Sequence, residues 1–257
     1  LVPAAPHGHL HSPLSLLSAT RNNNLVYNLN QKAGCTTVLN FMVMLELGAL
    51  PKREIDVHDQ APDVLLRWGS EEFEDILLGE NPFVFTFVRN PYRRFLSGFF
   101  DKIAADRDAN FEELRQDLRS EWGFPQKIDE NNVEDAIDRF LDNLESRFES
   151  HHGIFVEDPH FNPQTHNINF SQVRYDFIGQ VERLSEGLEI VLEHSQLQCD
   201  TGSLFERPFN RTRSTLYDRY ELSAGQKRRL EEFYAADFTN FASFYPLHSE
   251  QGSARGD

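Results

Sequence analysis

Two short apolar runs, each followed directly by a loop and a helical pattern, constrain the fold of this 257-residue chain more than any other feature. The first run, residues 25–29, is a strand candidate, and residues 36–47 after it carry apolar side chains at helical spacing. The second run, residues 83–88, is apolar almost throughout, as in a strand buried on both faces, and Asn90 with Pro91 then marks a helix start. Such repeated units predict an α/β fold with a central parallel sheet flanked by helices.

The remaining pattern predicts one folded domain. Further helices are expected from Ser70, over residues 132–148, over residues 185–197 and from Ser223, and a further strand over residues 175–179. We expect residues 25–247 to form the domain, with 105–150 as an acidic helical insertion, and residues 1–24 and 248–257 to be a flexible arm and tail.

Composition limits both the core and the partners. The 22 Phe against 2 Trp and 2 Met predict a core built largely of Phe packed among Leu and Val. The formal charge of -16 argues against nonspecific binding to nucleic acid or anionic lipid. Residues 101–149 carry 15 acidic and 7 basic side chains, which we interpret as a solvated helical face.

The sequence predicts no membrane span, because it has no run of about 18 apolar residues. The chain begins at Leu1 rather than Met, so a cytoplasmic location and a Golgi lumenal one after removal of a targeting segment both stay open. Composition does not predict the oligomeric state.

The first loop, Gln31–Thr37 (the Lys32 loop), combines a cation, small residues and two hydroxyl groups between a strand and a helix. A phosphate cradle needs these features, because backbone N–H groups must approach the anion closely at a helix N-terminus. The Walker A pattern is absent. An ordinary strand-to-helix turn is the alternative interpretation.

The second switch from strand to helix places Arg89 at the strand end and Ser97 about two turns into the helix. These two residues suit a second phosphate, since ligands bind at the carboxyl ends of parallel strands. A carboxylate partner on the acidic surface is the alternative for Arg89. Arg93 and Arg94 are expected to lie on the surface.

These segments resemble a known family. K-A-G-C-T-T at Lys32–Thr37 and R-N-P-Y-R-R-F-L-S-G-F at Arg89–Phe99 resemble the 5'-phosphosulfate loop and the 3'-phosphate motif of sulfotransferases that use PAPS (3'-phosphoadenosine 5'-phosphosulfate). The relatives are carbohydrate sulfotransferases, of the Golgi type that sulfates hydroxyl groups of chondroitin, dermatan and heparan. Asp158–Gln164, Tyr175–Glu182 and Leu230–Tyr245 resemble later segments of the same family.

The resemblance implies a three-layer fold of the P-loop NTPase type and in-line transfer of the sulfuryl group from PAPS to a hydroxyl, leaving PAP, without a metal. It assigns catalysis to Lys32, which would meet charge on the leaving phosphate oxygen. The residues that it implies for nucleotide binding are Lys32, Ala33, Gly34, Cys35, Thr36, Thr37, Arg89, Ser97, Arg211, Thr212 and Arg213.

The acceptor hydroxyl needs a base, and histidine suits that role. His58 lies between the two phosphate motifs, where relatives carry a catalytic histidine, so it ranks first; neighbouring carboxyl groups at 56 and 59 are able to orient or replace it. His160 ranks second as base, and His160 with His166 are candidates for acceptor contact. The acceptor is expected to be a carbohydrate or a small molecule. A noncatalytic nucleotide-binding protein and a Mg²⁺-dependent phosphoryl transferase of the P-loop type remain as alternatives.

Overall fold

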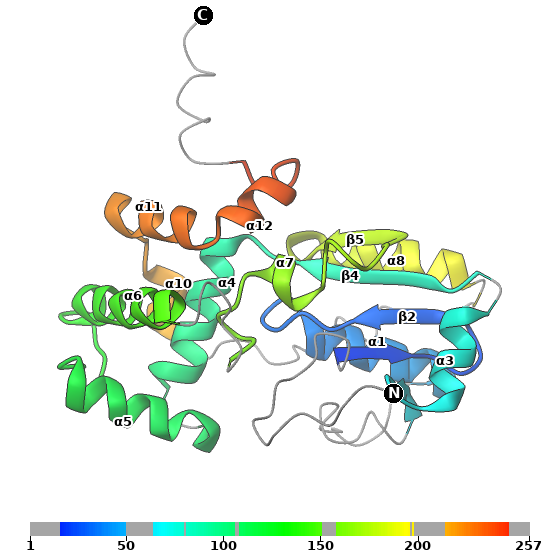
Figure 1. Cartoon of the computed structure of the whole chain (residues 1–257), viewed down its shortest axis with the longest axis horizontal. Helices are drawn as coiled ribbons and strands as arrows, with labels where there is room; N and C mark the ends of the chain where they lie inside the picture. Colours follow the sequence, from blue (N-terminus) through cyan, green and yellow to red (C-terminus); the bar gives the residue numbers. More distant parts are fainter. Residues whose placement is uncertain are drawn as a thin grey trace, which may run out of the picture.

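The computed structural model describes residues 16–49, 64–79, 81–105, 108–150, 158–195, 197 and 214–246, and its strands form one sheet (Figure 1). The strands are β1 (Leu17–Ala19), β2 (Leu25–Asn28), β3 (Leu66–Arg67), β4 (Phe83–Val88) and β5 (Phe177–Gln180). The helices are α1 (Cys35–Leu47), α3 (Glu71–Leu78), α4 (Pro91–Gly98), α5 (Glu112–Glu121), α6 (Val133–Ser150), α7 (Gln164–Asn167), α8 (Leu184–Ser195), α10 (Thr215–Arg219), α11 (Ala224–Phe233) and α12 (Ala235–Asn240). Short π and 3₁₀ segments lie at η2 (Phe99–Ile103), η3 (Ala109–Phe111) and η4 (Val181–Arg183).

The sheet has the order β3-β1-β2-β4-β5, and its centre is parallel. β2 pairs in parallel with β4, and β4 with β5, so that Tyr27 lies opposite Phe85 and Phe87 opposite Gly179. The carboxyl ends of these three strands therefore lie at one edge, and helices α1, α4 and α8 follow them there. The expected α/β fold with parallel strands flanked by helices is confirmed.

Order begins earlier than the sequence pattern predicts. The expected flexible arm, residues 1–24, includes β1, which pairs antiparallel with both β2 and β3. Leu17 and Ala19 are buried, and Thr20 closes the turn to β2 by accepting a hydrogen bond from the Leu25 N–H at 3.1 Å. A strand of three residues is too short to show alternation, so only its pairing with β2 reveals it. Residues 1–15 and 247–257 lie outside the described part of the chain.

Helices cover both faces of the sheet and make three layers (Figure 1). On one face, α1 and α8 pack against the rings of Tyr27, Phe85 and Phe87. On the other face, α3 packs through Phe73 against a layer that includes Val26. Residues alternate between the faces along each strand, which explains why the central strands are apolar almost throughout.

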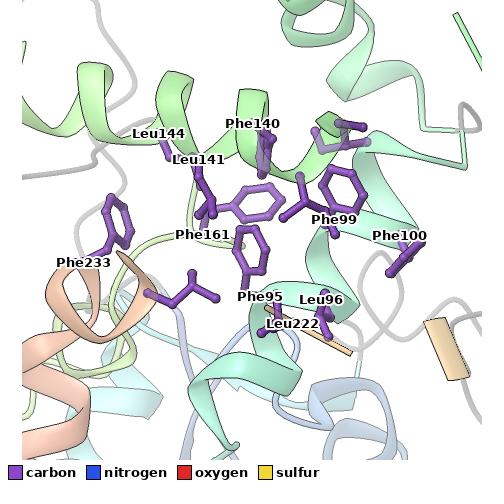
Figure 2. Packing of buried hydrophobic residues seen from close by; sticks show 14 of the residues in the cluster. Phe95, Leu96, Phe99, Phe100, Phe140, Leu141, Leu144, Phe161, Leu222 and Phe233 are labelled. Carbon is purple, nitrogen blue, oxygen red and sulfur yellow. The ribbon is translucent and has the colours of Figure 1, made fainter. Parts of the chain in front are cut away.

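The remaining helices gather around a second core beyond the carboxyl edge of the sheet, where α4, α5, α6, α10 and α11 lie together in Figure 1. Figure 2 shows this core, in which Phe95, Phe99, Phe140 and Phe161 contact one another from α4, η2, α6 and the segment before α7. Ring centroids are 4.9 Å apart for Phe140 and Phe161 and 5.6 Å apart for Phe99 and Phe140. The predicted phenylalanine core is confirmed. The predicted insertion, residues 105–150, supplies α5 and α6 to this shared core.

Local capping signals set the helix starts. The Asn90 side chain accepts hydrogen bonds from the backbone N–H groups of Tyr92 and Arg93, and proline occupies the first position of α4. Ser223 and Gln226 form the predicted capping box at α11. These helices begin where the sequence places them.

Candidate functional site

The Lys32 loop joins β2 to α1 at the carboxyl edge of the sheet. Lys32 and Gly34 both have left-handed backbone conformations, with φ of 62° and 73°, so the chain turns sharply into the helix. Gly34 is the N-cap of α1 and supplies no side-chain cap to the first N–H groups of the helix. Backbone donors at the start of a 13-residue helix suit an anion, because the helix dipole adds to their partial positive charge.

Lys32 itself lies largely buried beside this loop. Its ammonium pairs with the carboxylate of Asp101, and only 15% of its side chain is exposed. Burial lowers the pKa of Lys32, and the carboxylate of Asp101 offsets part of that effect. Asp101 belongs to η2, the π-helical segment that continues α4, and also faces Lys102 with N···O at 3.4 Å. Lys32 is thus held by a carboxylate from the element that follows the second phosphate motif.

Arg89 brings the two predicted phosphate motifs together. Its Nη1 donates to the backbone carbonyl of Lys32 at 3.1 Å, and its Nη2 donates to the Tyr217 hydroxyl at 2.7 Å. These partners are a carbonyl and a hydroxyl group, whereas the alternative interpretation of Arg89 required a carboxylate. Tyr217 lies on α10, so α10 contacts the carboxyl edge of the sheet through Arg89.

The structure corrects the prediction for one of the two arginines on α4. Arg93 is exposed as expected, but Arg94 is only 1% exposed. Its guanidinium donates to the backbone carbonyls of Gln31, Asn162 and Pro159 at 2.9, 2.7 and 2.8 Å. Such a group is buried because three backbone acceptors satisfy it.

Helical spacing offered a signal for Arg94 that the sequence interpretation missed. Arg94 lies three residues before Ser97, and residues three apart share one face of a helix. Ser97 is buried as well, with 4% exposure. The face of α4 that carries Ser97 is therefore the inner face.

Gln164 is a second residue that the sequence interpretation missed. Its side-chain oxygen accepts from Asn30 Nδ2 at 3.0 Å and from the Arg89 backbone N–H at 2.9 Å, and its Nε2 donates to the Arg89 carbonyl at 2.8 Å. Its own backbone N–H donates to the carboxylate of Asp237 on α12 at 2.8 Å. Gln164 is fully buried and so ties the end of β2 to the end of β4. The only sequence signal for Gln164 was that the segment Asp158–Gln164 resembles a segment of the sulfotransferases named above.

The two candidate histidines of this region differ in their surroundings. Nδ1 of His160 lies 2.7 Å from Oδ1 of Asp158, and 24% of its side chain is exposed. His166 is exposed on α7, two residues beyond Gln164. The structure therefore brings Lys32, Arg89 and the His160 segment to one edge of the sheet.

Several predicted residues fall outside the described ranges. These are His58 with the carboxyl groups at 56 and 59, and Arg211, Thr212 and Arg213. Over the ranges that the structure describes, no group of three or more His, Cys, Asp or Glu side chains is arranged to hold a metal ion. No helix in the described part is long and apolar enough to cross a membrane.

Comparison with protein families agrees with this arrangement. A family model described as the sulfotransferase family matches residues 17–246. The chain belongs to the sulfotransferase family. Comparison of this sulfotransferase with curated proteins and with solved structures gave no significant match. The matched region starts at the first residue of β1 and includes the Lys32 loop, α4 and α12, so the resemblance of the sequence motifs to this family is confirmed.

Proposed function

We propose that this sulfotransferase transfers the sulfuryl group of PAPS to a hydroxyl of a carbohydrate or small-molecule acceptor. The observation that carries the proposal is the contact between Arg89 Nη1 and the Lys32 carbonyl, at 3.1 Å. It joins the loop before α1 to the residue that precedes the start of α4, so the two elements proposed to bind anions lie side by side at the carboxyl edge of the sheet. A donor with phosphate groups at both its 5' and 3' positions needs two such elements.

The proposed donor contacts divide between these elements. The 5'-phosphosulfate is assigned to the Lys32 loop, whose N–H groups, two threonine hydroxyls and one ammonium complement an anion. The 3'-phosphate is assigned to Arg89 and Ser97. Arg211, Thr212 and Arg213 are proposed to close over the nucleotide, because Tyr217, shortly after them, contacts Arg89. In this proposal, residues near the start of the chain and residues 211–213 bind the same PAPS molecule. The residues of the Lys32 loop in this role are Lys32, Ala33, Gly34, Cys35, Thr36 and Thr37.

Lys32 carries the proposed catalytic role. PAPS supplies an activated sulfuryl group, whose departure leaves negative charge on a phosphate oxygen. Lys32 stabilises that charge when its ammonium turns from Asp101 to the anion, and partial burial strengthens this interaction because the local dielectric is low. No metal is required in this scheme, since Lys32 and Arg89 supply the positive charge.

The acceptor is proposed to be neutral. The chain carries a formal charge of -16, which disfavours long polyanionic acceptors, and Lys32 and Lys102 at the site are both paired with carboxylates. His160 and His166 are proposed to face the acceptor from the segment that leads into α7. A neutral sugar or a small alcohol fits this balance of charge.

The test is transfer of label from radiolabelled PAPS to a mixed library of acceptors, read out by mass spectrometry of the products. Lys32→Ala is expected to lower transfer by roughly 10²–10³-fold, as removal of one charge-stabilising donor does elsewhere. Lys127→Ala is the matched control, because Lys127 is exposed on the loop before α6. Wild-type protein that transfers no label to any acceptor would favour the noncatalytic alternative.

Ligand binding separates the sulfotransferase from the phosphoryl transferase. PAP at 100-fold above its Kd is expected to stabilise the fold by about 2.7 kcal/mol, which corresponds to about 5–10 °C in Tm for a chain of this size. ATP with Mg²⁺ is expected to leave Tm unchanged. Stabilisation by ATP with Mg²⁺ and not by PAP would instead identify a phosphoryl transferase.

A further inference from the structure

The pair formed by Asp158 and His160 has the arrangement of an oriented base. One carboxylate oxygen, Oδ1, accepts from the His160 backbone N–H at 2.9 Å and lies 2.7 Å from ring Nδ1. Because a carboxylate only accepts hydrogen bonds, the neutral form of this imidazole carries its proton on Nδ1 and has its electron pair on Nε2. The ring packs on Phe111 in a T-shaped arrangement, with centroids 5.4 Å apart and an interplanar angle of 77°. The imidazole is thus fixed by a carboxylate and an aromatic ring.

Arg94 places this pair beside the Lys32 loop. One guanidinium donates to the carbonyls of Gln31 and Pro159, at 2.9 and 2.8 Å. These are the residues immediately before Lys32 and His160, so both backbones meet at a single planar group. Arg94 is buried and the bonds are charge-assisted, which holds the two segments at a constant separation.

A second set of contacts, made by side chains, connects Lys32 with His160. The Lys32 ammonium pairs with Asp101, whose carboxylate also lies 3.4 Å from the Lys102 ammonium. That ammonium lies 5.6 Å from the centroid of the Phe111 ring, the ring that packs on His160. Two independent paths therefore bring His160 into the neighbourhood of the proposed catalytic lysine.

We propose that His160 is the general base of the reaction and that Asp158 is its positioning residue; this inference rests on the proposed function. The acceptor oxygen forms a bond to sulfur while the bond between sulfur and the 5'-phosphate oxygen breaks. The electron pair of the broken bond stays on the phosphate oxygen, beside Lys32. The hydroxyl proton passes to Nε2 of His160. The step needs no further reactant.

Among the described residues, Asp101 also lies near Lys32 and is able to accept a proton, and its surroundings make it a weaker base. Burial raises its pKa, but the ammonium groups of Lys32 and Lys102 outweigh burial and hold the pKa of Asp101 below its ordinary value of 3.8. His160 pairs with Asp158, also interacts with Asp108, and keeps 24% of its side chain exposed. The geometry therefore favours His160 over Asp101.

The test compares His160→Gln with wild type, using PAPS and the best acceptor from the library. The variant is expected to lose about 10²–10⁴-fold in kcat, while the rise in Tm produced by PAP is unchanged. His194→Gln is the matched control, because the His194 ring stacks on Phe83, at the opposite end of β4 from Arg89. It is expected to keep wild-type kcat. His160→Gln that binds PAP and keeps kcat within about threefold of wild type overturns the inference.

Asp158→Asn tests the positioning role and covers the case in which His160→Gln does not fold. An amide accepts from the Nδ1–H less strongly than a carboxylate and can present its NH2 group instead, so the ring is held less firmly. We therefore expect kcat to fall by at least about tenfold, while KM for PAPS and the rise in Tm with PAP stay unchanged. A kcat within about threefold of wild type overturns the inference.

The experiments distinguish failure of the inference from failure of the proposed function. If wild-type protein transfers no label, both the proposed function and the inference are wrong. If wild type is active and His160→Gln is equally active, only the inference is wrong. If His58→Gln is inactive in the same experiment, the base is His58.

Discussion

Arg94 is the residue whose replacement most directly tests how the site is held together. Arg94→Lys keeps the charge, but one ammonium cannot reach three carbonyls that lie around a planar guanidinium. The Pro159 carbonyl keeps Asn167 Nδ2 as a donor at 2.7 Å, so at least one of the carbonyls of Gln31 and Asn162 is left without a partner. A buried acceptor without a partner costs about 1–3 kcal/mol, which is the expected loss in the free energy of unfolding, against the about 5–15 kcal/mol that typically holds a domain folded.

Urea unfolding followed by tryptophan fluorescence measures this loss, since Trp68 packs on Phe73 of α3 and Trp122 packs against the second core. Arg93→Lys is the matched control on the next residue of α4, where the side chain is exposed, and it is expected to change the free energy of unfolding by less than about 0.5 kcal/mol. The Arg94 variant should also show a smaller rise in Tm with PAP, because Gln31 adjoins Lys32. A loss below about 1 kcal/mol, or one equal to that of the control, would refute the assigned contacts.

Two further predictions concern packing and charge. A Cβ on Gly187 in α8 would lie 2.6 Å from Cε1 of Phe87, so Gly187→Ala is expected to destabilise by about 1–3 kcal/mol in the same urea assay. The control is Gly225→Ala in α11, whose Cβ would meet only an ordinary contact at 3.8 Å. It is expected to raise the free energy of unfolding by up to about 1 kcal/mol, because alanine favours helices more than glycine does. A change of the same sign in both variants would contradict the packing argument. Because the pKa of Asp101 is lower in the folded chain than its ordinary value of 3.8, its ionised form stabilises the fold above that pH. The difference in unfolding free energy between wild type and Asp101→Asn should thus be positive at pH 7 and shrink below about pH 4, whereas a constant difference would show that Lys32 does not sense this carboxylate.

The site was partly predictable because some of its signals are local. The Lys32 loop and Arg89 each follow an apolar run and precede a helix, and Asn90 with its proline marks the turn. The topology of a parallel sheet then requires both to lie at the same edge, which the contact between Arg89 and the Lys32 carbonyl bears out. The assignment of each residue to a phosphate stays a proposal.

Other parts of the site had no local signal. Asn30 and Gln164 are 134 residues apart, and the bond between them exists only because β2, β4 and the segment before α7 meet at one edge. Lys32 and Asp101 are 69 residues apart and are joined by the π-helical continuation of α4. The spacing of Arg94 from Ser97 was a local signal for burial, but the three carbonyls that satisfy its guanidinium come from residues 31, 159 and 162, which no local pattern connects.

The sequence by itself determined the strand–loop–helix units, the helix starts at Asn90 and Ser223 and the phenylalanine core, because propensity, capping and hydrophobic period act over a few neighbouring residues. Only the tertiary structure decided the pairing of β1, the burial of Arg94 and the partners of Lys32 and His160. These features depend on which distant groups the fold brings within hydrogen-bond distance. Buried polar groups must be satisfied there, and their partners come from wherever the chain returns to the carboxyl edge of the sheet.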